Sequence, residues 1–266
     1  MAQETERPLH SCERFKTEDV LTSFNCQFIE AHSSDGAKVL LQKMKLIRSL
    51  PPDAEGKLCC IKHPGLLSVI DVIVVEDAVV LVHPDFSGEP LTYVVNKEQS
   101  MSPMQAITLF RKLVQVQVDL SHFPMPMWTS LDPRNICIYD DEPFVLFCGL
   151  KNHTTLPQND QGKSLLYYLL TGEYPQNVVD QSRDIRKNLR RVPRLIRQLA
   201  LDMLEKDYTE EELLAEVDRV LEELTQKRLD RSRADEPKSK PSAAAASWLI
   251  LDSKRVNTPS GKSVVD

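Results

Sequence analysis

The feature that most constrains the fold is a change in hydrophobic spacing near Pro103. Between Phe15 and Val82 the chain consists of short runs rich in Val, Ile, Leu and Phe, separated by turn residues, which is typical of β-strands. After Pro103, apolar residues recur at near-helical spacing. Strands followed mostly by helices predict an α+β fold with two subdomains. The chain has 266 residues, of which 41% are hydrophobic, and this is enough to form the hydrophobic core of such a fold.

The spacing predicts individual elements. Glu76-Asp77 predicts a tight hairpin turn, and Ser102-Pro103 predicts the N-cap and first turn of a long helix. Pro51-Pro52 limits the length of a helix predicted near residues 45–62. The predicted strands cover residues 26–31, 37–44, 67–75, 78–82, 136–138 and 144–146, and the other predicted helices cover residues 104–120, 163–170, 191–205 and 210–225.

Charge and composition exclude several classes of protein. The net charge is −6 and the basic residues form no obvious stripe, so we expect no nucleic-acid partner. No apolar run is long enough to span a membrane, and the polar start MAQETERPLH does not resemble a signal peptide, so we expect a cytoplasmic or nuclear protein. The cysteines form no CxxC pair and no metal-ligand spacing, and we interpret them as reduced, mostly buried residues: Cys12, Cys26, Cys59, Cys60, Cys137 and Cys148.

Six motifs in a fixed order resemble those of the eukaryotic protein kinases. SLDPRNI, starting at Ser130, resembles the catalytic loop HRDLxPxN, and FCGL, starting at Phe147, falls at the spacing of the DFG motif. The remaining four are the turn HPG at residues 63–65, the strand and hinge at residues 79–86, the helical segment GKSLLYYLLTGEYP at residues 162–175, and the closing helices at residues 195–217. One motif alone occurs by chance, whereas six in order indicate a degenerate member of this superfamily.

The resemblance implies a bilobal fold with a small β-rich N-lobe and a larger α-helical C-lobe. It places the kinase-like domain at residues 14–226, with the N-lobe at about 14–83 and the C-lobe at about 89–226. Residues 1–13 are then a flexible N-terminus. Residues 227–266 are charged, then rich in alanine and serine, which predicts a disordered C-terminal tail.

Three groups on which phosphoryl transfer depends are missing at the matched positions. Gln42 replaces the phosphate-binding lysine, Ser130 replaces the general base, and Phe147 replaces the DFG aspartate that binds Mg²⁺. An aromatic ring has no oxygen ligand for Mg²⁺. No glycine precedes Gly36, so the glycine-rich loop that covers the phosphates is also absent. Each loss would cost several kcal/mol of transition-state stabilisation, in the order of magnitude seen for such groups.

Other matched positions are retained or altered. Asp132 stands where active kinases carry lysine, and Asn135 and Gly149 are retained. We interpret Asn135 as a structural asparagine that bonds the loop backbone. Lys43 is adjacent to Gln42, but successive strand side chains point to opposite faces, so it does not replace Gln42 without a register slip. The glutamate expected on the regulatory helix falls at Ala54, one residue before Glu55.

These positions predict no catalytic residues, no metal and weak or absent ATP binding. The expected function is a catalytically inactive protein-kinase-like domain that binds protein partners as a scaffold or allosteric regulator in signalling. The alternative is an atypical serine/threonine kinase that uses Lys43 or Lys45 with Asp132, and a third possibility is ATP as a structural ligand without turnover. An apolar island in the tail is either a partner-docking motif or a short helix that packs back on the domain: Trp248, Leu249, Ile250 and Leu251.

Overall fold

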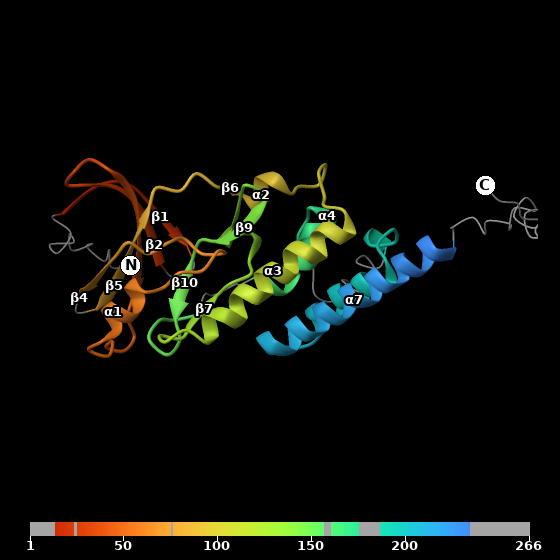
Figure 1. Cartoon of the computed structure of the whole chain (residues 1–266). Helices are drawn as coiled ribbons and strands as arrows, with labels where there is room; N and C mark the ends of the chain where they lie inside the picture. Colours follow the sequence, from red (N-terminus) through yellow and green to blue (C-terminus); the bar gives the residue numbers. More distant parts are fainter. Residues whose placement is uncertain (1–13, 24–25, 76, 157–160, 176–186, 235–266) are drawn as a thin grey trace, which may run out of the picture. The chain divides into compact units, whose positions relative to one another are not determined.

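The computed structural model describes residues 14–23, 26–75, 77–156, 161–175 and 187–234. The chain divides into two compact units, residues 1–222 and 223–266, and the last helix spans the boundary between them. Within the described ranges, the first unit contains all of the strands and most of the helices. It is a mixed α+β structure with an N-terminal antiparallel sheet followed by helices (Figure 1).

The elements follow the predicted order. The strands are β1 (Phe15–Ser23), β2 (Cys26–Ser33), β3 (Lys38–Lys45), β4 (Asp71–Val75), β5 (Ala78–Pro84), β6 (Glu89–Pro90), β7 (Met127–Thr129), β8 (Ile136–Tyr139), β9 (Glu142–Val145) and β10 (Cys148–Leu150). The helices are α1 (Ala54–Cys59), α2 (Leu91–Val94), α3 (Pro103–Ser121), α4 (Leu165–Thr171), α6 (Arg194–Glu205) and α7 (Glu210–Ala234), with 3-10 turns η2 (Pro133–Asn135) and η3 (Gly162–Ser164).

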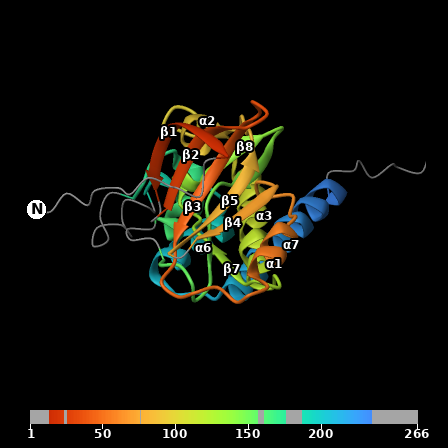
Figure 2. The ribbon, with the colours of Figure 1, turned by 90° about the vertical axis from the view of Figure 1, so that its left-hand side faces the viewer.

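The first sheet has five antiparallel strands in the order β1-β2-β3-β5-β4 (Figure 2). One of its faces carries a buried aliphatic cluster, formed by Ile29, Ala31, Val39, Leu41, Val80 and Val82. Because side chains alternate along a strand, the neighbouring residues lie on the opposite face. There, the paired positions Phe28, Gln42, Leu81 and Val72 form one buried row across four strands. Gln42 is the only polar member of this row.

Helix α3 supports the later half of the unit, and its start follows the prediction. Ser102 caps it, since its Oγ accepts a hydrogen bond from the amide of Gln105, and the Gln105 side chain returns to the Ser102 amide. The helix packs against α4, β7 and β9. Figure 1 shows β7 and β10 between the five-stranded sheet and α3. As a result, the buried row that contains Gln42 lies against β10.

Helix α4 is buried on all sides, and a glycine ends it. Six consecutive residues from Leu165 to Leu170 are buried. Gly172 follows at φ +71°, and a Cβ at this position would lie 2.0 Å from the carbonyl oxygen of Asn96. The left-handed backbone and this close approach both require glycine here.

Some predicted boundaries were wrong. The strand predicted at residues 67–75 begins only at Asp71. The preceding residues form a connection with isolated backbone hydrogen bonds, such as the one from Ile70 N to Val82 O at 2.8 Å. The helix predicted near residues 45–62 is reduced to α1, which starts after Pro51-Pro52. Strand β1 was not predicted individually, because its exposed Val20 and Leu21 obscure the alternation expected of a half-buried strand.

The last helix is longer than predicted. Helix α7 continues to Ala234, past the predicted domain end at residue 226. The added turns contain good helix formers, and side chains four residues apart stabilise them: Gln226 donates to Asp230 at 2.9 Å and Lys227 pairs with Glu223 at 3.4 Å. The part of the predicted tail beyond Ala234 lies outside the described residues.

Candidate functional site

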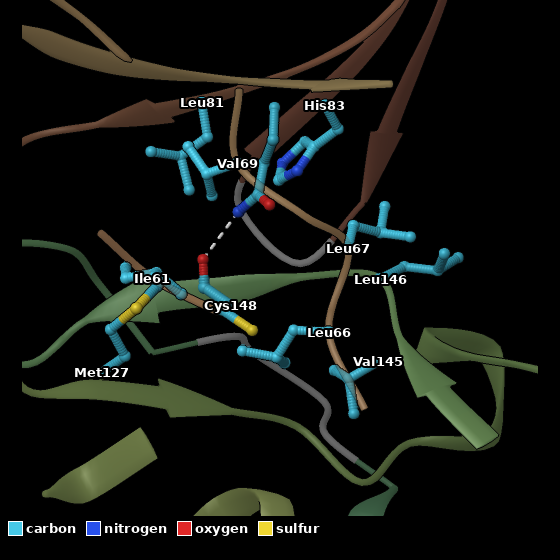
Figure 3. Close-up of a pocket in the computed structure, with 11 residues that line it drawn as sticks. Ile61, Leu66, Leu67, Val69, Leu81, His83, Met127, Val145, Leu146 and Cys148 are labelled. Carbon is cyan, nitrogen blue, oxygen red and sulfur yellow. Dashed lines mark hydrogen bonds between the residues drawn. The ribbon is translucent and has the colours of Figure 1, made fainter. Parts of the chain in front are cut away.

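The candidate site lies where the buried row of the sheet meets β10. The side-chain amide of Gln42 donates a hydrogen bond of 2.6 Å to the carbonyl oxygen of Cys148, and both groups are buried (dashed line in Figure 3). Figure 3 shows Leu81 and His83 on the sheet side of this bond and Leu66 and Val145 on the other side. A neutral hydrogen bond therefore joins two segments that are 106 residues apart.

Three aromatic rings fill the space beside this bond, and we call Phe28, Trp128 and Phe147 the aromatic cluster. The ring of Phe147 makes an edge-to-face contact with Trp128 at 5.3 Å and another with Phe28 at 6.5 Å, between ring centroids. The exposed fractions are 7% for Phe28, 6% for Trp128 and 1% for Phe147. The cluster joins β2, β7 and the segment before β10 by apolar packing.

Gly149 makes room for this cluster. Its position in β10 pairs with Trp128 in β7, and an added Cβ would lie 2.3 Å from two atoms of the indole ring and 2.7 Å from Oγ1 of Thr154. No side chain fits at that distance, so the glycine is required by close packing.

Asn135 holds the segment that contains Phe147. Its Oδ1 accepts from the Phe147 amide at 2.8 Å, and its Nδ2 donates to the carbonyls of Ser130 at 2.9 Å and Phe147 at 3.1 Å. Nδ2 also lies 3.1 Å from Oγ1 of Thr129, which itself donates to the Phe147 carbonyl at 2.6 Å. With 1% of its surface exposed, Asn135 is committed to bonds within the protein.

In the loop between β7 and η2, the polar side chains also form hydrogen bonds within the protein. Ser130 is buried, and its hydroxyl accepts from the Asp132 amide at 3.0 Å. Asp132 has no exposed surface, and Arg134 donates to both of its carboxylate oxygens, from Nε to Oδ1 at 2.9 Å and from Nη2 to Oδ2 at 2.6 Å. The backbone amides of Arg134 and Gln161 add bonds of 2.9 and 3.1 Å. The carboxylate of Asp132 is thus neutralised and saturated with donors.

A small cavity lies next to Gln42. Its volume is about 10 Å³, and its walls include Leu81, His83, Met127 and Cys148. Nδ1 of His83 donates to the Ser68 carbonyl at 3.0 Å, whereas Nε2 has no partner among the described residues. A cavity of about this size holds at most one water molecule. Pockets for small organic ligands are larger, at about 300–1,000 Å³.

The groups around this cavity are uncharged at neutral pH. Burial lowers the pKa of His83 to about 4, since the imidazolium is poorly solvated there. Burial also raises the pKa of the Cys148 thiol to about 12, with a smaller opposing effect from a hydrogen bond to Thr129. Gln42 carries no charge. The cavity wall therefore offers no charged side chain to a phosphate or a metal ion.

Comparison with known proteins gives the fold. No protein-family model matches the sequence, and no curated protein matches it significantly. Solved structures do match, among them that of Rad53 residues 1–466 in complex with AMP-PNP, with a TM-score of 0.56 and 15% identity. The match covers 77% of this chain and 65% of the Rad53 chain.

The chain has a protein-kinase-like fold. The predicted resemblance is therefore correct at the level of the fold. Because the identity is below 25%, the likeness supports the fold and carries no conclusion about activity.

With this kinase-like fold, the positions matched to kinase motifs do come together. Gln42, Phe147 and Gly149 lie at the contact between β3 and β10, and Ser130, Asp132 and Asn135 lie in the loop beside it. Two other candidates do not join them. Lys43 occupies the alternate position in β3 and is half-buried, and Glu55 is exposed on α1, where Ala54 is the buried neighbour.

Sequence reasoning missed four residues that complete the site. Phe28 and Trp128 surround Phe147, Thr129 donates to its carbonyl, and Arg134 neutralises Asp132. Arg134 could have been found, since it lies two residues after Asp132 in a loop with an Asp-Pro turn signal. Nothing in the local pattern around Phe28 indicated that it meets Phe147.

Searches for other kinds of site are negative within the described ranges. No group of three or more His, Cys, Asp or Glu side chains there could hold a metal ion. None of the helices in that part of the chain is long and apolar enough to cross a membrane. Of the five cysteines it contains, Cys26, Cys137 and Cys148 are buried and Cys59 and Cys60 are exposed, and all are free thiols. The predicted docking residues Trp248, Leu249, Ile250 and Leu251 and the thiol of Cys12 lie outside it.

Proposed function

We propose that this chain is a catalytically inactive protein-kinase-like domain that acts through protein binding, as a scaffold or allosteric regulator in signalling. The observation that carries the proposal is the position of Phe147. At the place matched to the metal-binding aspartate, a buried phenylalanine packs against Phe28 and Trp128. Mg²⁺ binds through oxygen ligands, and this cluster supplies none.

The remaining groups also favour inactivity. The side-chain amide of Gln42 donates to the Cys148 carbonyl, and it carries no positive charge that could bind a phosphate. Asp132 cannot readily accept a proton from a substrate hydroxyl, because its oxygens already accept four hydrogen bonds from Arg134 and Gln161. Asn135 is similarly committed to Phe147 and its neighbours. These contacts weigh against the rival hypothesis of an atypical kinase based on Asp132.

The packing also favours weak or absent nucleotide binding as part of the proposal. The cavity that Gln42 lines measures about 10 Å³, so this cavity as it stands cannot hold a nucleotide. To bind a triphosphate in the kinase pose, the protein would have to open the Gln42–Cys148 bond and move the aromatic cluster. The Rad53 structure of the same fold contains AMP-PNP, so nucleotide binding needs a direct test.

The test is a phosphotransfer assay with radiolabelled ATP and Mg²⁺, on the purified chain alone and with a generic protein substrate. An active protein kinase serves as the positive control. We expect no transfer above background. If transfer occurs and is lost in both Asp132→Asn and Lys43→Met, the chain is an atypical kinase and the proposal fails.

A thermal-shift titration with ATP, with and without Mg²⁺, separates the third possibility. A ligand that binds only the folded state increases the free energy of unfolding by RT ln(1 + [L]/Kd), and the melting temperature rises as a result. We expect no shift at millimolar ATP. A shift without phosphotransfer would identify ATP as a structural ligand and refute the weak-binding part of the proposal.

A further inference from the structure

A cluster of basic side chains lies on the surface between residues 187 and 197, and we call it the basic surface. This segment of eleven residues contains five cations and no acidic residue: Lys187, Arg190, Arg191, Arg194 and Arg197. The sequence-based expectation that basic residues form no stripe was therefore wrong for this segment. The cations are divided between the residues before Pro193 and helix α6, which contains Arg194 and Arg197.

The backbone of the basic surface is fixed to the core. Leu189 and Ile196 are both 0% exposed, so they anchor the turn and the helix on either side of Pro193. The amide of Val192 donates to the Leu189 carbonyl at 3.1 Å, and the side chain of Asn188 donates to the Tyr167 hydroxyl at 2.9 Å. The cations are consequently presented on a defined backbone and lose less freedom on binding.

The side chains point to solvent and have no acidic partner in the described ranges. Lys187, Arg190, Arg191 and Arg194 are exposed, and Arg197 is half-buried. Elsewhere in that part of the chain, arginines do pair with acids, as Arg111 does with Asp218 at 2.6 Å and Arg134 with Asp132 at 2.6 Å. Five like charges in one short segment repel each other, and a negatively charged ligand relieves this repulsion.

The chemistry of the surface favours an acidic protein segment. Four of the five cations are arginines, whose planar fork binds carboxylate and phosphate with two parallel hydrogen bonds. A long nucleic acid would extend beyond this surface over a chain whose net charge is −6, where it would be repelled. Membrane-surface binding needs exposed large apolar side chains beside the cations, and the described ones lie outside this segment.

We propose that the basic surface is a docking site for a short acidic protein segment, which carries phosphoryl groups or clustered carboxylates. This inference rests on the proposed protein-binding function and names the chemistry of the partner. Phosphoryl groups and carboxylates share the same recognition by arginine, so the experiment has to separate them.

The experiment measures fluorescence anisotropy of labelled synthetic peptides with the full chain. The first peptide contains three phosphoserines, the second has glutamate at the same positions, and the third has unmodified serine. We expect the phosphorylated or the glutamate peptide to bind, with a salt-sensitive affinity, and the serine peptide not to bind. The difference between the first two identifies the source of the negative charge.

Two matched triple variants test the location. In Arg190→Gln, Arg191→Gln, Arg194→Gln, we expect about tenfold weaker binding, since three exposed ion pairs are lost. The control is Lys38→Gln, Arg48→Gln, Lys62→Gln, which removes three exposed cations of the sheet region and changes the net charge equally. The control should bind the peptide as the unaltered chain does. All substituted side chains are exposed, so the melting temperatures should stay the same.

Three outcomes would overturn the inference. One is no binding of either acidic peptide, and another is equal weakening in both triple variants. The third is tighter binding of duplex DNA, single-stranded RNA or anionic vesicles than of any peptide, with loss in the first variant only. Phosphotransfer measured on the same samples tests the proposed inactivity separately, because none of the substituted residues touches the aromatic cluster or Asp132.

Discussion

Acidification should destabilise the protein through His83. The ring is 3% exposed, its Nδ1 donates to Ser68, and its Nε2 faces a cavity without a partner among the described residues. A proton on Nε2 would place a positive charge in an apolar environment. Burial therefore lowers the pKa of His83 in the folded chain from 6.5 to about 4.

The size and direction of the effect follow from this difference. The unfolded chain takes up the proton near pH 6.5 and the folded chain only near pH 4, so the unfolded state binds more protons in between. Stability from the neutral His83 is fully present above about pH 6.5 and is lost as the pH falls towards about 4. At about 1.4 kcal/mol per pKa unit, the loss is on the order of 3 kcal/mol.

The assay is urea unfolding followed by tryptophan fluorescence at several pH values between 8 and 4, for the unaltered chain and for His83→Asn. The asparagine amide can still donate to the Ser68 carbonyl, but it does not titrate. Carboxylates with lowered pKa values, such as Asp35 and Asp53, titrate in both proteins, so the difference between the two curves isolates His83. The reasoning would be refuted if the free energy of unfolding fell equally in both.

Three substitutions test the packing of the candidate site, each by urea unfolding, with Met104→Ala at an exposed position as a neutral reference. Phe147→Ala should cost about 3–5 kcal/mol, since a fully buried ring leaves a cavity, and a cost near zero would mean that the aromatic cluster is not formed. Gly149→Ala should destabilise the protein and change the tryptophan fluorescence, because the new Cβ would lie 2.3 Å from the Trp128 ring; an unchanged spectrum would contradict this contact. Asn135→Ala should cost about 1–3 kcal/mol or more, since it leaves the buried Phe147 amide without a partner, and a loss below about 0.5 kcal/mol would contradict the described bonds.

The order of the elements could be predicted from the sequence. The change from strand-like runs to helical spacing at Pro103 is local information, and so is the Ser102 cap, which the structure confirms. The pairing of Val75 with Ala78 at the ends of β4 and β5 also agrees with the predicted hairpin. These features depend on residues close together in the chain, which is why a single sequence reveals them.

The identity of the missing chemical groups was also a property of the sequence. Gln42, Ser130 and Phe147 cannot supply a phosphate-binding charge, a carboxylate base or a metal ligand in any fold, because those groups are not in their side chains. The resemblance of the motifs then predicted which positions belong together. The structure places Gln42 and Phe147 at the contact between β3 and β10, and Ser130 in the loop beside it.

Only the tertiary structure decided what these side chains do instead. Phe28, Trp128 and Phe147 come from three distant segments, and their packing depends on long-range pairing that no local period encodes. The complete burial of Asp132, its bond from the Gln161 amide and the small cavity beside His83 were decided there too. Which functional groups a chain lacks follows from the identity of each residue in the sequence. The burial, hydrogen-bond partners and pKa of each side chain instead depend on neighbours that the fold brings together.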